Sequence, residues 1–179
     1  GQVRLGGPSA EPAPWERDEG SGPVIEPYPS VEPEPRVPLD EDCYRADPFI
    51  CEIELEIARL TNEMRRTPFQ YSGRIAFVSR LWSEQMGNMR RIGHGGFPAQ
   101  RARDYQAEFG VQASLMAENV AMTGYGSTDA ATIARQFVDM WANSPGHRRN
   151  MLGNFPALGV GVVQVGRSFY ATQIFGAHR

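Results

Sequence analysis

The distribution of proline most limits what this chain can fold into. Ten of the 14 prolines stand in the first 48 of 179 residues. Each proline lacks an amide donor and fixes its own φ, and it also disfavours helix at the residue before it. The apolar residues between these prolines follow neither a helical nor a strand period. We therefore predict that residues 8–42 are extended and polyproline-like, with no independent fold.

Charge separates the same part of the chain from the rest. Residues 1–47 carry 11 acidic and 4 basic side chains, a net charge of −7, whereas residues 48–179 carry 10 acidic and 14 basic ones, a net charge of +4. No basic stripe with interleaved aromatic residues is present, so we expect no nucleic-acid partner. No apolar run approaches the length of a membrane span, so we expect no transmembrane segment. The sequence thus predicts an acidic Pro-rich arm, residues 1–47, followed by one domain, residues 48–179.

A segment that cannot fold alone can still lie along another surface. The Pro-rich arm could lie across its own basic domain, or it could dock on a protein partner or a larger assembly, including one at a membrane. We expect docking on a partner, with Trp15, Tyr28 and Tyr44 as aromatic anchors. The alternative is a flexible spacer that keeps the domain away from a surface.

Two cysteines, Cys43 and Cys51, stand where the arm meets the domain. In an oxidising compartment they could form a disulfide that closes a short loop. In a reducing compartment they would be two free thiols. The spacing of the cysteines leaves both alternatives open.

Apolar residues recur at spacings of three and four in most of the domain, which predicts helices. Ser127 or Thr128 is expected to cap the last of them. The predicted helices cover residues 48–67, 72–94, 97–110 and 129–143.

Strand-like runs follow or separate these helices. Residues 114–122 are expected to be extended, and two β runs at residues 157–165 and 168–176 flank Gly166-Arg167, where we expect a hairpin turn. Because helices come first and a hairpin last, the sequence predicts an α+β domain built in layers.

The stretch "WANSPGHRRNML", residues 141–152, has the features of a helix start. Ser144 can serve as the N-cap, and Pro145 suits the first helical position. His147 then lies in the first turn, where the partial positive charge of the helix terminus favours the neutral imidazole. Such a histidine could be a metal ligand, a base or a hydrogen-bonding group.

Five motifs in order resemble the bacterial branch of the CAP superfamily, also called SCP-like after cysteine-rich secretory proteins, antigen 5 and pathogenesis-related proteins. They are "HGGF", "AENVA", a tryptophan followed by "SPGHRRNML", "LGVGV" and "YATQIFG". The resemblance covers residues 53–176 and excludes the Pro-rich arm. It implies an α-β-α sandwich with a small antiparallel sheet between helices, and an extracytoplasmic location, either secreted or periplasmic.

The resemblance also implies a cleft in which two histidines and two acidic residues can hold a divalent cation. His94, His147 and Glu118 match three of these positions, while Ser144 stands where the second acid is usual. Two imidazoles and one carboxylate could still bind a zinc-like ion. In the alternative without a metal, His94 closes a loop through hydrogen bonds and Glu118 accepts from backbone donors.

From these observations we expect an extracytoplasmic protein that binds or scaffolds, as an accessory subunit, and that requires no cofactor. The first alternative is a metal-assisted hydrolase using His94, Glu118 and His147. The second is sterol or lipid binding in an apolar groove. A nucleophilic Ser144–His147 pair is not expected, because Ser144 should be engaged in capping the helix.

Overall fold

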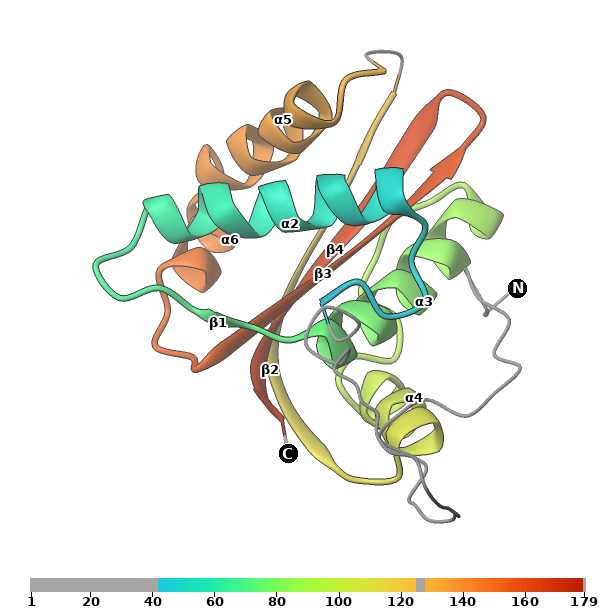
Figure 1. Ribbon diagram of the computed structural model, residues 1–179, viewed down its shortest axis with the longest axis vertical. Coiled ribbons are helices and arrows are strands. Elements are labelled where there is room, and N and C mark those ends of the chain that lie inside the picture. The colour runs from blue at the N-terminus through green and yellow to red at the C-terminus, as the bar shows by residue number, and fades with distance from the viewer. Residues whose placement is uncertain (1–41, 125–127, 179) are drawn as a thin grey trace, which may run out of the picture.

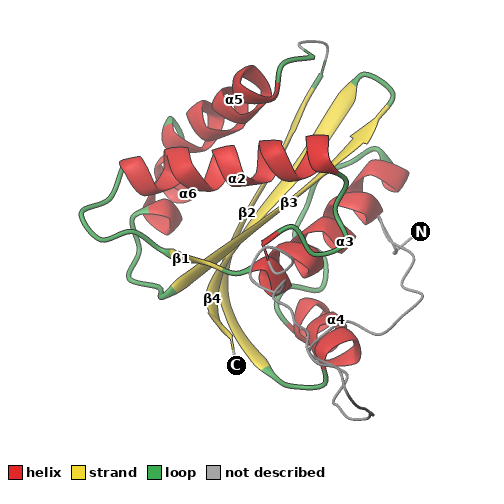
Figure 2. Cartoon of the chain, in the orientation of Figure 1, coloured by secondary structure: helices red, strands yellow, loops and turns green. Residues whose placement is uncertain are grey.

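The computed structural model describes residues 42–124 and 128–178, which form one layered domain. Trp15 and Tyr28, expected to anchor the arm, lie outside the described residues. Two groups of helices cover the two faces of a central sheet (Figures 1 and 2). Within the described ranges, no helix has the length and apolarity needed to cross a membrane.

The helices and strands alternate along the chain. The helices are α2 (Pro48–Glu63), α3 (Gly73–Met89), α4 (Ala99–Phe109), α5 (Ala130–Ala142) and α6 (Pro145–Met151). The strands are β1 (Gln70–Tyr71), β2 (Ala113–Thr123), β3 (Ala157–Val165) and β4 (Ser168–His178).

The four described strands form one sheet in the order β1-β3-β4-β2. The pairs β3–β4 and β4–β2 are antiparallel, and the β3–β4 hairpin turns at Gly166, whose φ is 64°. The short β1 adds a parallel edge beside the start of β3. The predicted α+β sandwich is confirmed, with β1 as a strand that the apolar pattern did not predict.

Alternate residues of β3 face the two helical layers, because successive side chains of a strand point to opposite faces. Leu158, Val160 and Val162 belong to the main apolar core, which they share with α2 and α5. On the other face, α3 and α4 pack on the sheet (Figure 1).

Two glycines of β3 allow α3 to lie directly on the sheet. A Cβ at Gly159 would stand 2.3 Å from the amide nitrogen of Ala76, and one at Gly161 would stand 2.0 Å from that of Arg80. Ser83 of α3 uses this proximity to donate to the carbonyl of Gly161 at 2.8 Å. The "LGVGV" motif is therefore explained by backbone contact between β3 and α3.

A buried ion pair joins the two helical layers through the sheet edge. Arg80 of α3 binds both carboxylate oxygens of Glu54 of α2, at 2.7 and 2.8 Å, and the backbone N–H of Val162 donates to the same carboxylate at 3.0 Å. Burial raises the pKa of the Glu54 carboxyl, while Arg80 and the Val162 N–H act in the opposite direction. Both side chains are almost fully buried, so each satisfies the other.

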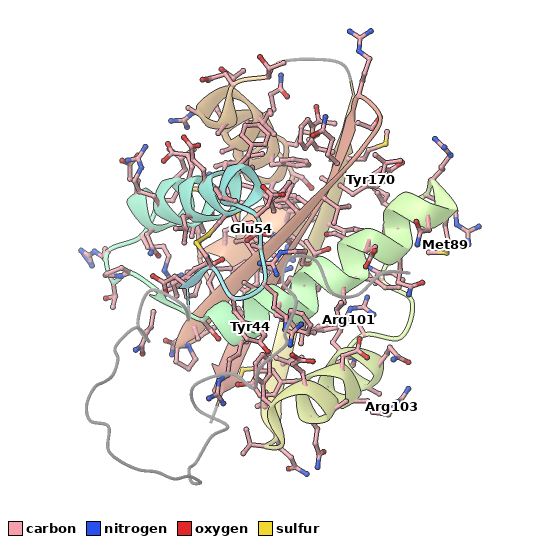
Figure 3. All side chains as sticks on the ribbon, turned by 45° about the vertical axis from the view of Figure 1, so that its right-hand side comes forward. Tyr44, Glu54, Met89, Arg101, Arg103 and Tyr170 are labelled. Carbon is pink, nitrogen blue, oxygen red and sulfur yellow. A yellow bond between two sulfur atoms is a disulfide. The ribbon has the colours of Figure 1, made fainter. Side chains whose placement is uncertain are left out.

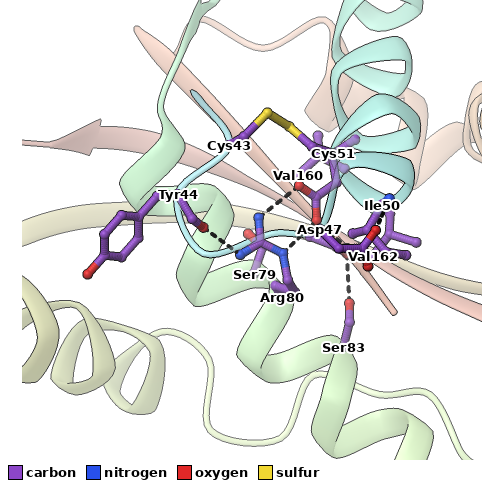
Figure 4. A network of polar contacts seen from close by, with 12 residues as sticks. Cys43, Tyr44, Asp47, Ile50, Cys51, Ser79, Arg80, Ser83, Val160 and Val162 are labelled. Atoms are coloured by element: carbon purple, nitrogen blue, oxygen red, sulfur yellow. Dashed lines mark hydrogen bonds and ion pairs between the residues drawn. A yellow bond between two sulfur atoms is a disulfide. The ribbon is translucent and has the colours of Figure 1, made fainter. Parts of the chain in front are cut away.

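The end of the Pro-rich arm is fastened to this pair (Figure 4). Cys43 and Cys51 are bonded in a disulfide, and Arg80 donates to the backbone carbonyl of Tyr44 at 3.0 Å. Tyr44 is only 8% exposed, and its ring centroid lies 5.4 Å from that of Phe77 and 5.3 Å from that of Phe109. Tyr44 thus packs into its own domain rather than being presented to a partner, and packed structure begins before the expected boundary at residue 48.

Helix ends differ from the sequence-based expectation at two places. The helix expected to run to residue 94 ends at Met89, because Arg90 adopts a left-handed backbone with φ 53°. His94 therefore lies in a loop. The cap of α5 is Asp129, whose carboxylate accepts from the N–H of Thr132 at 2.9 Å, and not Thr128. Ser127, the other expected cap, lies outside the described residues.

The buried Glu54–Arg80 pair leads to a testable prediction about stability. Replacing Arg80 with Met leaves the Glu54 carboxylate buried without its partner, so we expect the free energy of unfolding to fall by about 3–5 kcal/mol. Arg59→Met is the matched control, because Arg59 pairs with Glu56 and Glu63 on the exposed face of α2 and should matter much less. Urea unfolding with the disulfide intact measures both, and equal losses in the two variants would contradict this role for the pair.

Candidate functional site

The loop before α4 and the middle of β2 bring His94 and Glu118 together. Nδ1 of His94 and Oε1 of Glu118 are 2.8 Å apart. The Glu118 side chain is 1% exposed, whereas that of His94 is 51% exposed. The pair therefore has a buried acid and a solvent-accessible imidazole, and Glu118 fixes which ring nitrogen of His94 is engaged.

Arg101 of α4 holds the same carboxylate from inside the protein. Its Nε donates to Oε2 of Glu118 at 2.7 Å and its Nη2 donates to Oε1 at 3.2 Å. Its Nη1 donates to the carbonyl of Gly95 at 2.8 Å, and the guanidinium lies 3.8 Å from the ring centroid of Trp82. Figure 3 marks Arg101 where α3 and α4 approach each other. All hydrogen bonds described for the Glu118 carboxylate thus involve side chains. The sequence-based alternative in which Glu118 accepts from backbone donors is wrong.

A chain of side-chain amides holds the second histidine in place. Asn119 of β2 donates to the backbone carbonyl of His147 at 3.1 Å and to Oε1 of Gln173 at 3.0 Å. Asn150 of α6 donates to the side-chain oxygen of Asn119 at 2.9 Å, and Gln173 donates to Thr61 of α2 at 2.9 Å. These bonds fix the position of α6 against β2, so the backbone of His147 has a defined place beside the sheet.

The side chain of Ser144 does not cap α6 as the sequence suggested. Ser144 occupies the N-cap position, but its Oγ lies 2.8 Å from Nδ1 of His147 and makes no capping bond to a backbone amide. Burial and, to a smaller extent, the charge of His94 lower the pKa of His147 from its ordinary value. The neutral imidazole that the sequence predicted is favoured for these two reasons.

The carboxylate of Glu118 is already engaged by two other side chains. The resemblance implied ligands at His94, Glu118 and His147, but Glu118 is bound by Arg101 through both oxygens and by His94 through one of them. Within residues 42–124 and 128–178, no group of three or more His, Cys, Asp or Glu side chains is arranged to hold a metal ion. In this geometry Glu118 orients His94 from behind, as a carboxylate does for a histidine that binds elsewhere through its other nitrogen.

Sequence reasoning missed the residues that support the site. Arg101 shares one face of α4 with Tyr105 and Phe109, and these three are the buried residues of that helix. A charged residue at the same helical spacing as two buried aromatic residues was a signal that it must find a buried partner. Gln173 carried no such signal, because its partner Asn119 lies on a neighbouring strand.

Two open cavities flank α3 outside the His94–Glu118 pair. One, of about 490 Å³, is bounded by Ile50 and Val162, with Glu84 at its side. The other, of about 570 Å³, lies against Trp82 and includes Glu84 and Asp104. Burial raises the pKa of both carboxyl groups. Each cavity combines apolar walls with an acidic side chain.

The environment of His147 predicts its titration. We expect the His147 ring to titrate below 6.5, the ordinary value of a histidine pKa, because burial disfavours the charged form. His94→Gln removes a nearby positive charge and should raise the pKa of His147, without restoring the ordinary value, since burial is the larger cause. Imidazole NMR signals followed against pH measure this. A His147 pKa at or above 6.5 in the unaltered protein would contradict the burial argument.

Comparison with known proteins gives a family match over most of the domain. A family model described as the cysteine-rich secretory protein family, CAP, matches residues 57–175. The uncharacterized protein YkwD of Bacillus subtilis strain 168 is 28% identical over 128 residues, which are 69% of this chain and 47% of the relative. The chain therefore spans about half the length of that curated relative.

One solved structure shares the fold at low sequence identity, and a second is reported with it. An outer surface protein of Borrelia burgdorferi is 18% identical, with a TM-score of 0.51 over 70% of this chain and 89% of the other. An extracellular protein containing an SCP domain from Bacillus anthracis is 20% identical, with a TM-score of 0.49 over 69% of this chain and 40% of the other. Because the family model spans well over half of the residues, this chain belongs to the cysteine-rich secretory protein (CAP) family.

Proposed function

We propose that this CAP protein is an extracytoplasmic binding or accessory subunit, whose Pro-rich arm docks on a protein partner while the domain serves as its base. The location is supported by the disulfide, which is typical of oxidising compartments, and by the outer surface protein of Borrelia burgdorferi that shares the fold. The structure describes the arm only from residue 42, so docking of residues 1–41 is the proposed step.

The observation that carries the proposal is the fastening of the arm where it meets the domain. Residues 43 and 44 are fixed by three contacts: the Cys43–Cys51 disulfide, the Arg80 bond to the Tyr44 carbonyl and the burial of Tyr44. A spacer needs only a covalent connection to its domain. A docking arm gains from a fixed exit point, because less conformational freedom is lost when it binds.

The site geometry also supports binding over hydrolysis. Arg101 already neutralises Glu118, and in the described part of the chain the ring of His147 is bonded to Ser144 and to no acidic side chain. A serine nucleophile with a histidine base normally has a third group that orients the base. The sterol or lipid alternative is less well supported, because Glu84 or Asp104 lines each of the two cavities beside α3.

The docking role is tested by removing the arm outside its fastened end. A chain of residues 42–179 keeps every described contact of the domain, so it should fold and unfold like the full chain. On native gels of envelope extracts from the source cells, we expect the full chain in a larger complex and the shortened chain as a free species.

Cross-linking supplies the second measurement and its control. A photoreactive amino acid at Trp15 or Tyr28 should give one discrete heavier adduct, whereas the same group at the exposed Met140 of α5 should not. If the shortened chain still joins the complex, or if cross-linking at Trp15 and Tyr28 gives no adduct, the arm is a spacer and the proposal is wrong.

A further inference from the structure

At the positions that the family resemblance assigns to a cleft, the most unusual group is a guanidinium rather than a histidine. Arg101 is completely buried, at 0% side-chain exposure, and it lies directly behind the carboxylate that the family resemblance assigns to a metal. Three hydrogen bonds and the ring of Trp82 hold it there. A buried guanidinium so fully bonded has no freedom to move aside for an incoming ion.

The acceptor capacity of Glu118 shows what this means for metal binding. Oε1 already accepts from Arg101 and lies 2.8 Å from Nδ1 of His94, so both lone-pair directions of that oxygen are occupied. Oε2 accepts from Nε of Arg101 at 2.7 Å. A zinc-like ion needs its carboxylate oxygen at about 2.0–2.2 Å, which would place a second cation beside the guanidinium.

Charge balance leads to the same result. Arg101 cancels the charge of Glu118, and Ser144 stands where the family resemblance implies a second acid. The two imidazoles contribute no negative charge. A divalent cation would therefore enter a site with no net negative charge to compensate its own.

We infer that Arg101 is the built-in cation of this cleft: it takes the place of a divalent ion, holds Glu118 as the orienting partner of His94, and keeps the site metal-independent. Arg101 is thus a positioning residue for His94. The inference goes beyond the proposed docking function, because it concerns the cleft and would hold whether or not the arm binds a partner.

The test is to remove the charge of Arg101 while keeping the shape of its side chain. Arg101→Met retains an unbranched apolar chain against Trp82, and Arg101→Lys keeps the charge but loses the two-pronged contact. Arg103→Met is the matched control, because Arg103 is on the same helix and is exposed, bonded to Gln100. Zn²⁺ is titrated calorimetrically into each metal-free full-length protein, and into the same protein with His94→Ala.

The expected results separate charge from structure. In three backgrounds, namely the unaltered protein, Arg103→Met and Arg101→Lys, adding His94→Ala should leave the Zn²⁺ titration unchanged. Arg101→Met should bind Zn²⁺ more tightly, by on the order of tenfold or more, and this gain should disappear with His94→Ala. If the unaltered protein binds Zn²⁺ through His94, or if folded Arg101→Met gains nothing, the inference is wrong.

A second measurement serves if Arg101→Met does not fold. The thermal unfolding midpoint of the unaltered protein is compared with that of His94→Ala, each in Zn²⁺ and in EDTA. We expect the same change with Zn²⁺ in both proteins, because any bound zinc would lie elsewhere. A rise in the midpoint that needs His94 would show that the cleft takes a metal despite Arg101, and would overturn the inference.

Discussion

The ion pair between Glu54 and Arg80 is the interaction on which most of this fold depends. It joins α2 to α3, accepts the backbone N–H of Val162 in β3, and through Arg80 holds the carbonyl of Tyr44. Two charges buried to this degree are tolerated only when each is paired and hydrogen-bonded, so both helices must be seated on the sheet before either charge is satisfied. The pair therefore specifies how the layers fit together, and it fixes the end of the Pro-rich arm by the same contacts.

The cleft repeats this chemistry with one difference. Arg101 and Glu118 form a second buried guanidinium–carboxylate pair, but one oxygen of Glu118 is shared with His94, which is half exposed. The Glu54–Arg80 pair contacts only buried groups, whereas the Arg101–Glu118 pair orients His94, a side chain that solvent can reach. The two pairs are alike in residue type and burial. Glu54–Arg80 stabilises the core, whereas Arg101–Glu118 also positions a side chain at the surface.

The sequence predicted what depends on local periodicity and motif order. The apolar spacings located α2, α3 and α5, the β runs located β3 and β4, and the motif resemblance pointed to His94 and Glu118, which lie in contact. It could not predict the partner of Arg101, because a buried charge pairs with whichever carboxylate shares its space, here one on β2. The expectation for Ser144 was wrong, because its side chain contacts the ring of His147 instead of a backbone amide of α6. The expectation for Tyr44 was wrong because its burial depends on Phe77 and Phe109, which come from two helices distant in sequence.

The position of His147 depends on the core more than on its own short helix. Thr61 in α2, Gln173 in β4 and Asn119 in β2 form a continuous chain of hydrogen bonds that ends on the carbonyl of His147. Buried amides of this kind are costly when unpaired, so the chain is stable only with every member in place. The second histidine is consequently fixed from the same helix that carries Glu54. The place of the His147 backbone is therefore set by α2, β4 and β2 together.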